Sequence, residues 1–154
     1  ELNLHEIKET TQYTDLEIET VACGYIPIML SEYCPMGVVA RSCKKDKRCA
    51  NCKESKYVLR DFKGEEYRVS QDIFCRSTIY NSSANCLINN LDELSEAGIN
   101  IFRLDFTHET PELIEKITES FIDVIENDFV ADAKSLEVFE DMDTTLGHLY
   151  KGVE

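Results

Sequence analysis

Several familiar catalytic and targeting signatures are absent from this sequence. It has no glycine-rich phosphate loop and no Gly-x-Ser-x-Gly motif, and its three histidines do not assemble into a Ser/His/Asp set. No apolar run approaches the roughly 20 residues of a membrane-spanning helix, so we expect no membrane partner. Neither an internal repeat nor a low-complexity linker interrupts the 154 residues. We therefore predict a single domain, or a fragment of one, over residues 1–154.

Basic side chains are also scarce. Lys and Arg number 16 against 30 Asp and Glu, for a formal net charge of −14. This balance argues against general nucleic-acid binding, because phosphate contacts need cations. Half of the basic residues nevertheless fall between Arg41 and Arg60, where only Asp46 and Glu54 oppose them. The sequence predicts a local basic patch, and we interpret the acidic stretch over residues 123–143 as a solvated face.

The chain begins Glu-Leu-Asn-Leu, without an initiator Met and without a signal-peptide pattern. We therefore expect a piece of a longer protein with a cytoplasmic location.

Apolar periodicity predicts alternating helices and strands. The expected elements are a helix over residues 4–11 capped by Asn3, a strand over 16–23, a helix carrying Leu87, Leu91 and Leu94 that ends at Gly98, a strand over 99–106, and a helix that Thr110 caps with Pro111 at its first position. Such alternation indicates an α/β fold, either a parallel sheet or part of a (βα) barrel. There are too few strands to close a barrel of eight, so the predicted fold class is a partial, barrel-like α/β domain.

A long cysteine-rich insertion interrupts this pattern over residues 31–85. Inside it we predict a β-hairpin, in which residues 57–61 and 66–69 pair across a turn at Lys63 and Gly64. An insertion of about fifty residues is too long for an ordinary loop in a compact domain. We therefore expect it to be functional or stapled by a metal.

The sequence has seven cysteines, an odd number, and no secretion pattern, which favours metal binding or redox chemistry over disulfides. Cys49 and Cys52 form a CxxC pair, which can direct two thiolates at one ion from a tight turn. Neighbouring Lys and Arg favour the thiolate form. The candidates for the remaining ligands are Cys34, Cys43 and Cys75. The spacing matches neither a zinc ribbon nor a ferredoxin, so zinc, a 4Fe-4S cluster and free thiols all stay open.

Other candidate chemistry is limited to a few side chains. Cys23 lies in an apolar strand and is expected to be a core residue. Glu32 follows an apolar segment directly, and Asp105 lies near the end of the clearest strand beside Arg103. We predict Glu32 and Asp105 as catalytic residues, because βα barrels place active sites at the carboxyl ends of strands. A structural ion pair is the alternative for Arg103 and Asp105.

Six short segments carry a resemblance to a known family. They are, in order, residues 19–24 (Glu-Thr-Val-Ala-Cys-Gly), 26–37, 59–64, 75–82, 102–106 and 147–154. Together they resemble the collagenase-like peptidases, the unassigned-type peptidase family thirty-two, and residues 26–37 are similar to a segment of one bacterial branch. The resemblance spans nearly the whole chain. It implies the C-terminal half of a barrel-like catalytic domain, with the missing N-terminal half as its partner and a peptide as substrate.

The resemblance also implies a cofactor. Other members of the family resemble proteins that support oxygen-independent hydroxylation of tRNA uridine or of a quinone precursor, and these bind a 4Fe-4S cluster through four cysteines. Of the two cysteines in the family signature, the second falls on Cys34 but the first falls on Pro27. One expected ligand is therefore missing. The predicted ligands are Cys34, Cys43, Cys52 and Cys75, with Cys49 and Cys86 in reserve.

Three functions stay open at this point. The first is a peptidase catalytic fragment with a cysteine-ligated metal, the second is an iron–sulfur protein that acts on RNA or a quinone precursor, and the third is a zinc-stapled interaction module. Because half a barrel would expose apolar strand faces, a homo-oligomer is also expected.

Overall fold

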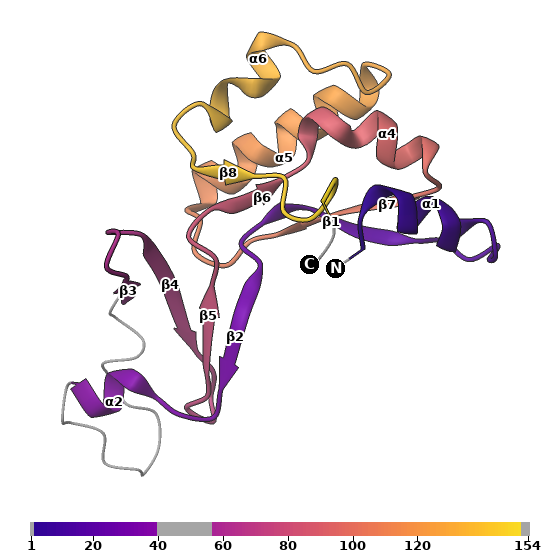
Figure 1. The fold of residues 1–154 in the computed structure, drawn as a ribbon. Helices are drawn as coiled ribbons and strands as arrows, with labels where there is room; N and C mark the ends of the chain where they lie inside the picture. Colours follow the sequence, from indigo (N-terminus) through magenta and orange to yellow (C-terminus); the bar gives the residue numbers. More distant parts are fainter. Residues whose placement is uncertain (1, 40–56, 152–154) are drawn as a thin grey trace. The chain divides into compact units, whose positions relative to one another are not determined.

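The computed structural model describes residues 2–39 and 57–151, and the chain divides into two compact units (Figure 1). Unit 1 comprises Glu1–Tyr25 and Ser83–Glu154, and unit 2 comprises Ile26–Ser82. Helices and strands occur together, so the predicted α/β class is confirmed. The described strands form two open sheets and close no barrel. Among the described helices, none has the length and apolar character needed to cross a membrane.

Unit 1 is built on a mixed four-stranded sheet. Its strands are β1 (Glu19–Gly24), β6 (Ala84–Cys86), β7 (Ile101–Asp105) and β8 (Thr144–Thr145), in the order β7-β1-β6-β8. β1 pairs in parallel with β7, and β6 with β8, but β1 and β6 are antiparallel. The expected all-parallel sheet is therefore wrong at β6, which runs back beside β1 directly after the chain returns from unit 2.

The helices of unit 1 follow the sequence signals closely. They are α1 (Leu4–Thr11), α4 (Leu91–Glu96), α5 (Pro111–Glu126) and α6 (Ala133–Leu136). Asn3 and Glu6 form a capping box at the start of α1, and the Thr110 hydroxyl accepts a hydrogen bond from the Leu113 amide at the start of α5. These caps satisfy amides that have no partner inside the helix. Both helices begin where their caps predict, so the predicted starts are confirmed.

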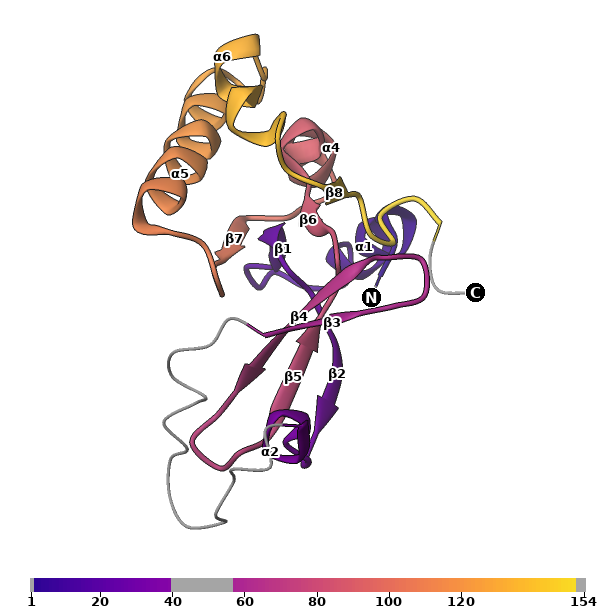
Figure 2. The ribbon, with the colours of Figure 1, turned by 90° about the vertical axis from the view of Figure 1, so that its left-hand side faces the viewer.

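The core of unit 1 lies between its sheet and α4 and α5, which cover the same face (Figure 2). Ile117, Phe121 and Val124 recur at helical spacing along α5 and pack with Leu91 of α4. Part of the acidic stretch also contributes apolar side chains, namely Leu136, Val138, Phe139 and Met142. The interpretation of residues 123–143 as a solvated face is therefore incomplete, because partly buried apolar residues alternate there with the carboxylates.

The start of α6 provides a pH-dependent prediction. Asp132 Oδ1 accepts the Ser135 amide at 2.7 Å, and hydrogen bonds from the Ser135 backbone and side chain lower the pKa of Asp132. We expect the Ser135 amide chemical shift to titrate with a midpoint below about 3.9, the value for an unfolded chain. The cap thus stabilises α6 above that pH, and its contribution is lost as pH falls through the folded-state pKa. A midpoint at or above about 3.9 would contradict this, and Asp132→Asn should abolish the titration.

Unit 2 is a four-stranded antiparallel sheet. Its strands are β2 (Pro27–Ser31), β3 (Val58–Arg60), β4 (Glu66–Gln71) and β5 (Ser77–Tyr80), in the order β2-β5-β4-β3, and α2 (Pro35–Val39) follows β2. The predicted hairpin is confirmed, since β3 pairs with β4 across a turn that contains Gly64. Among its described residues, Val69 is the single hydrophobic residue that is buried. The described part of unit 2 therefore lacks a sizeable apolar core of its own.

Candidate functional site

Two of the predicted cysteine ligands lie at the same end of the unit 2 sheet. β2 and β5 are antiparallel, and their pairing ends at Ser31 and Ser77. Cys34 comes shortly after β2, and Cys75 comes shortly before β5. Because the end of one antiparallel strand lies beside the start of its neighbour, both cysteines emerge at this end, where α2 also lies (Figure 1). We call it the cysteine end of unit 2.

Local hydrogen bonds orient the first of these cysteines. The Gly37 amide donates a hydrogen bond to Cys34 Sγ at 3.3 Å, within the turn that opens α2. The Cys34 side chain is half-buried, and its thiol is free. This bond fixes the direction of the Cys34 side chain at the start of α2.

The second cysteine is held in a backbone conformation that side chains rarely adopt. Cys75 has φ = 63°, in the left-handed region. Asp72 stabilises this turn, because its Oδ1 accepts the amides of Phe74 and Arg76 at 2.8 and 2.9 Å and its Oδ2 binds Arg76 Nε at 2.6 Å. Partial removal from water acts to raise the pKa of Asp72, but the hydrogen bonds from Arg76 and Phe74 outweigh it and lower that pKa. Such an over-determined, strained residue is typical of a functional constraint.

Two buried polar atoms lie at the cysteine end. Ser77 is fully buried, and neither its Oγ nor Nε2 of Gln71 has a hydrogen-bond partner within the part of the chain that the structure describes. Gln71 and Ser77 face each other in the last pair of β4 and β5. Each atom can donate a hydrogen bond, and a buried donor without an acceptor costs about 1–3 kcal/mol. Ser77 Oγ and Gln71 Nε2 are therefore suited to donate hydrogen bonds to acceptors other than those of the described residues.

The other predicted ligands, Cys43 and Cys52, lie outside the described residues, as does the reserve ligand Cys49. Within residues 2–39 and 57–151, no three or more His, Cys, Asp or Glu side chains gather as a metal site. A four-thiolate centre at the cysteine end would therefore take two ligands from Cys34 and Cys75 and two from residues 40–56.

The remaining two cysteines lie together in the core of unit 1. Cys23 of β1 faces Cys86 of β6, and both are buried. The expectation that Cys23 is a core residue is confirmed. The neighbouring Cys86 thiol and burial raise the pKa of Cys23, while Cys23 and the Ile88 amide lower the pKa of Cys86. Cys86, a reserve ligand in the sequence analysis, thus has Cys23 as its neighbour.

The two predicted catalytic carboxylates lie in different units. Asp105 ends β7 and binds Arg103 through both of its oxygens, at 3.0 and 3.1 Å, and Arg103 also binds Glu19 at 2.6 Å. These three side chains are close to half exposed, as in a surface ion-pair network. Glu32 is exposed in the turn after β2. The catalytic roles of Glu32 and Asp105 therefore stay predictions.

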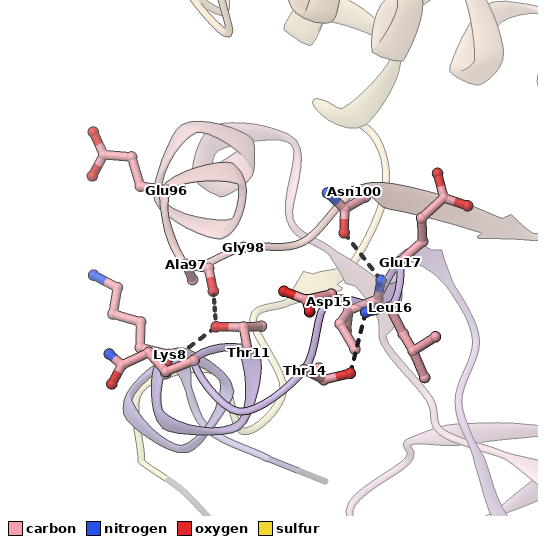
Figure 3. Close-up of a pocket in the computed structure, with 12 residues that line it drawn as sticks. Lys8, Thr11, Thr14, Asp15, Leu16, Glu17, Glu96, Ala97, Gly98 and Asn100 are labelled. Carbon is pink, nitrogen blue, oxygen red and sulfur yellow. Dashed lines mark hydrogen bonds between the residues drawn. The ribbon is translucent and has the colours of Figure 1, made fainter.

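A polar cavity of about 540 Å³ in unit 1 lies where β1 and β7 begin, at the end of these strands opposite Asp105 (Figure 3). Its walls are the end of α1, the segment before β1 and the turn before β7. The Thr11 hydroxyl donates to the Ala97 carbonyl at 2.7 Å, and the Ile18 amide donates to Asn100 Oδ1 at 3.1 Å. These bonds connect α1 to α4 and β1 to β7. In α/β folds, active sites lie at the carboxyl ends of parallel strands, so we assign this cavity a structural role.

Sequence reasoning missed the residues that support the cysteine end, namely Ser77, Gln71 and Asp72. A signal for one of them was present, because an Asp three residues before a Cys-Arg pair is typical of a side-chain-capped turn. The other two depend on the pairing of β4 with β5, which no local pattern specifies.

Unit 1 is a mixed α/β unit. Unit 2 is an antiparallel unit that carries cysteines and is inserted in the sequence between β1 and β6. Together they define a cysteine-containing α/β protein. The chain belongs to peptidase family U32, whose family model matches residues 1–151. The resemblance stated from the sequence is thereby confirmed. No curated protein and no solved structure matches the chain.

Proposed function

We propose that this chain is part of the catalytic domain of a family U32 peptidase, and that unit 2 holds a metal centre on Cys34, Cys43, Cys52 and Cys75. In this proposal unit 1 contributes to the barrel-like half of the domain, and the substrate is a peptide. Family membership supports the peptidase assignment. Glu32 and Asp105 are the proposed catalytic residues, since Glu32 follows β2 directly and Asp105 is the last residue of β7.

The observation that carries the metal proposal is that Cys34 and Cys75 lie at the same end of the unit 2 sheet. The antiparallel pairing of β2 with β5 brings these residues together although they are far apart in the sequence. Both thiols are free, and neither is fully buried. The segment that carries Cys43, Cys49 and Cys52 leaves from α2 and rejoins the described chain just before β3. Two of the proposed ligands thus lie next to paired strands, and the other candidates lie between them in the sequence.

The composition of unit 2 supports the same proposal. The described part of unit 2 buries little apolar surface, and a structural metal commonly stabilises a unit of this kind. The proposed donors are all thiolates, which suit a closed zinc site or an iron–sulfur cluster better than an open hydrolytic zinc site. When bound, such a group would pin the loop if it is zinc, or carry an electron if it is a cluster.

The residues around the proposed ligands have separate tasks. Asp72 fixes the turn that presents Cys75, and the Gly37 amide orients Cys34. Ser77 Oγ and Gln71 Nε2 would donate hydrogen bonds to sulfur ligands or to the backbone that carries them. Outer hydrogen bonds of this kind orient ligands and tune a metal, so these four residues form the proposed support of the site.

The proposal is tested by metal and acid-labile sulfide analysis of anaerobically purified protein. We expect about one zinc, or about four iron and four sulfide, per chain. Cys34→Ser and Cys75→Ser should each lose most of this content, because a serine hydroxyl does not replace a thiolate ligand. Cys86→Ser is the matched control, since it removes a thiol from unit 1, and it should keep the metal.

The outcomes separate the alternatives. Zinc would be compatible with proteolysis and would mean that the metal holds the loop in place. Iron with sulfide would favour a redox role on RNA or a quinone precursor. Metal that persists in both Cys34→Ser and Cys75→Ser would overturn the ligand assignment. So would protein that contains no metal after anaerobic purification.

A further inference from the structure

The pairing of β1 with β6 places two thiols directly opposite each other. Cys23 and Cys86 are partners in the register, and the Leu87 amide donates to the Ala22 carbonyl at 2.8 Å in the adjacent pair. Because the two kinds of pair alternate along an antiparallel ladder, Cys23 and Cys86 occupy a non-hydrogen-bonded position. At such positions the Cα atoms are about 4.5 Å apart and the side chains approach closely.

This spacing meets the requirements of a disulfide. A disulfide needs Cα atoms about 4.4–6.8 Å apart and Cβ atoms that face each other. The two side chains face each other across this pair of residues. Both are free, and both belong to the same buried cluster as Leu91 and Phe121. The register of the two strands therefore does not need to change for the two sulfurs to be joined.

We propose that Cys23 and Cys86 are a modification site, a dithiol that closes to a cross-strand disulfide by exchange with a small-molecule disulfide. Cys86 reacts first, because it is 9% exposed against 2% for Cys23. Its thiolate attacks one sulfur of the reagent, and the other sulfur leaves as a thiolate, which takes up a proton. Cys23 then loses its proton and attacks Cys86 Sγ, which releases the second thiol. One external disulfide is reduced to two thiols, and two protein thiols are oxidised.

The position of the pair along the chain gives the disulfide a consequence. The chain leaves unit 1 after Tyr25 and re-enters it at Ser83. The bond would therefore close a loop that contains the whole of unit 2. Cross-linking a loop of this length restricts the unfolded chain strongly, and we expect the melting temperature to rise by roughly 10 °C. This inference is independent of the metal proposal, because it uses neither Cys34 nor Cys75.

The experiment equilibrates the full chain with mixtures of oxidised and reduced glutathione. The samples are quenched in acid, alkylated in denaturant and digested, and the linked peptides are identified by mass spectrometry. We expect a link between the peptides of Cys23 and Cys86, reversed by dithiothreitol, together with the higher melting temperature. Cys75→Ser should keep the link, whereas Cys86→Ala should lose both the link and the temperature shift.

The incubation is repeated in urea just below the unfolding transition, so that burial does not prevent access of the reagent. Recovery of Cys23 and Cys86 as alkylated thiols under both conditions would overturn the proposal. So would links that join either residue to other cysteines, or stable glutathione adducts on Cys86 while Cys23 remains a thiol. Each of these readouts uses the wild-type chain, so failure of a variant to fold does not affect the test.

Discussion

Replacing Gly24 with alanine should destabilise unit 1 by roughly 4 kcal/mol or more, a large part of a domain's total stability. Gly24 ends β1 with φ = 137°, and a Cβ atom there would lie 2.3 Å from the backbone oxygen of Asp105. Real Cβ atoms do not approach so closely, and the obstacle is backbone, which cannot rotate away. The parallel pair β1 and β7 would have to separate at the end where Gly24 faces Asp105. Strained backbone and steric overlap each cost about 1–3 kcal/mol.

Hydrogen exchange measured by mass spectrometry distinguishes these two costs. In Gly24→Ala, peptides covering β1 and β7 should lose most of their protection. The matched control is Gly64→Ala, since Gly64 also has a positive φ of 93° but no atom within 4 Å of an added Cβ. Gly64→Ala should destabilise the chain only through the strained backbone, by about 1–2 kcal/mol, and should leave the protection of β1 and β7 unchanged. Equal effects of the two substitutions on unit 1 would show that the close approach of β1 to β7 is unimportant.

Phe121→Ala should destabilise the chain by about 3–5 kcal/mol in urea unfolding. Phe121 is 2% exposed on the buried face of α5, and its ring meets Phe139 edge-on with centroids 6.2 Å apart. Removing the ring leaves a cavity between the sheet and α5 that the surrounding side chains fill only in part. The helix itself should survive, because alanine is a strong helix former.

The neighbouring residue provides the control for this substitution. Ile122 follows Phe121 on the same helix but is 47% exposed, and Ile122→Ala should cost less than about 1 kcal/mol. A small effect at Phe121, similar to that at Ile122, would mean that α5 is not packed on the core as described.

Sequence patterns predicted the long elements well because local chemistry determines them. Thr110 and Pro111 specify the start of α5, and Gly64 specifies the turn of the β3–β4 hairpin. β6 and β8 were not predicted, since strands of three and two residues are too short to show a period. The antiparallel direction of β6 follows from where the chain re-enters unit 1, which is a tertiary property.

The candidate site was predictable in its residue types but not in its grouping. The cysteine count favoured a thiolate site, yet the sequence does not show that Cys34 and Cys75 share one end of a sheet. That result depends on β5, which lies in a region without helical period and was not predicted. Cys86 illustrates the opposite case, since the family resemblance made it a reserve ligand, whereas the structure pairs it with Cys23.

The antiparallel pairing of β1 with β6 also has an evolutionary consequence. Gly24 and Asn85 face each other in the sheet, so the two points at which the chain departs and returns are about one strand spacing apart. A tight turn of two residues would span the same gap. The inserted part is therefore modular: its length and sequence can diverge among descendants, or be exchanged by recombination, without a change in the pairing of β1 with β6.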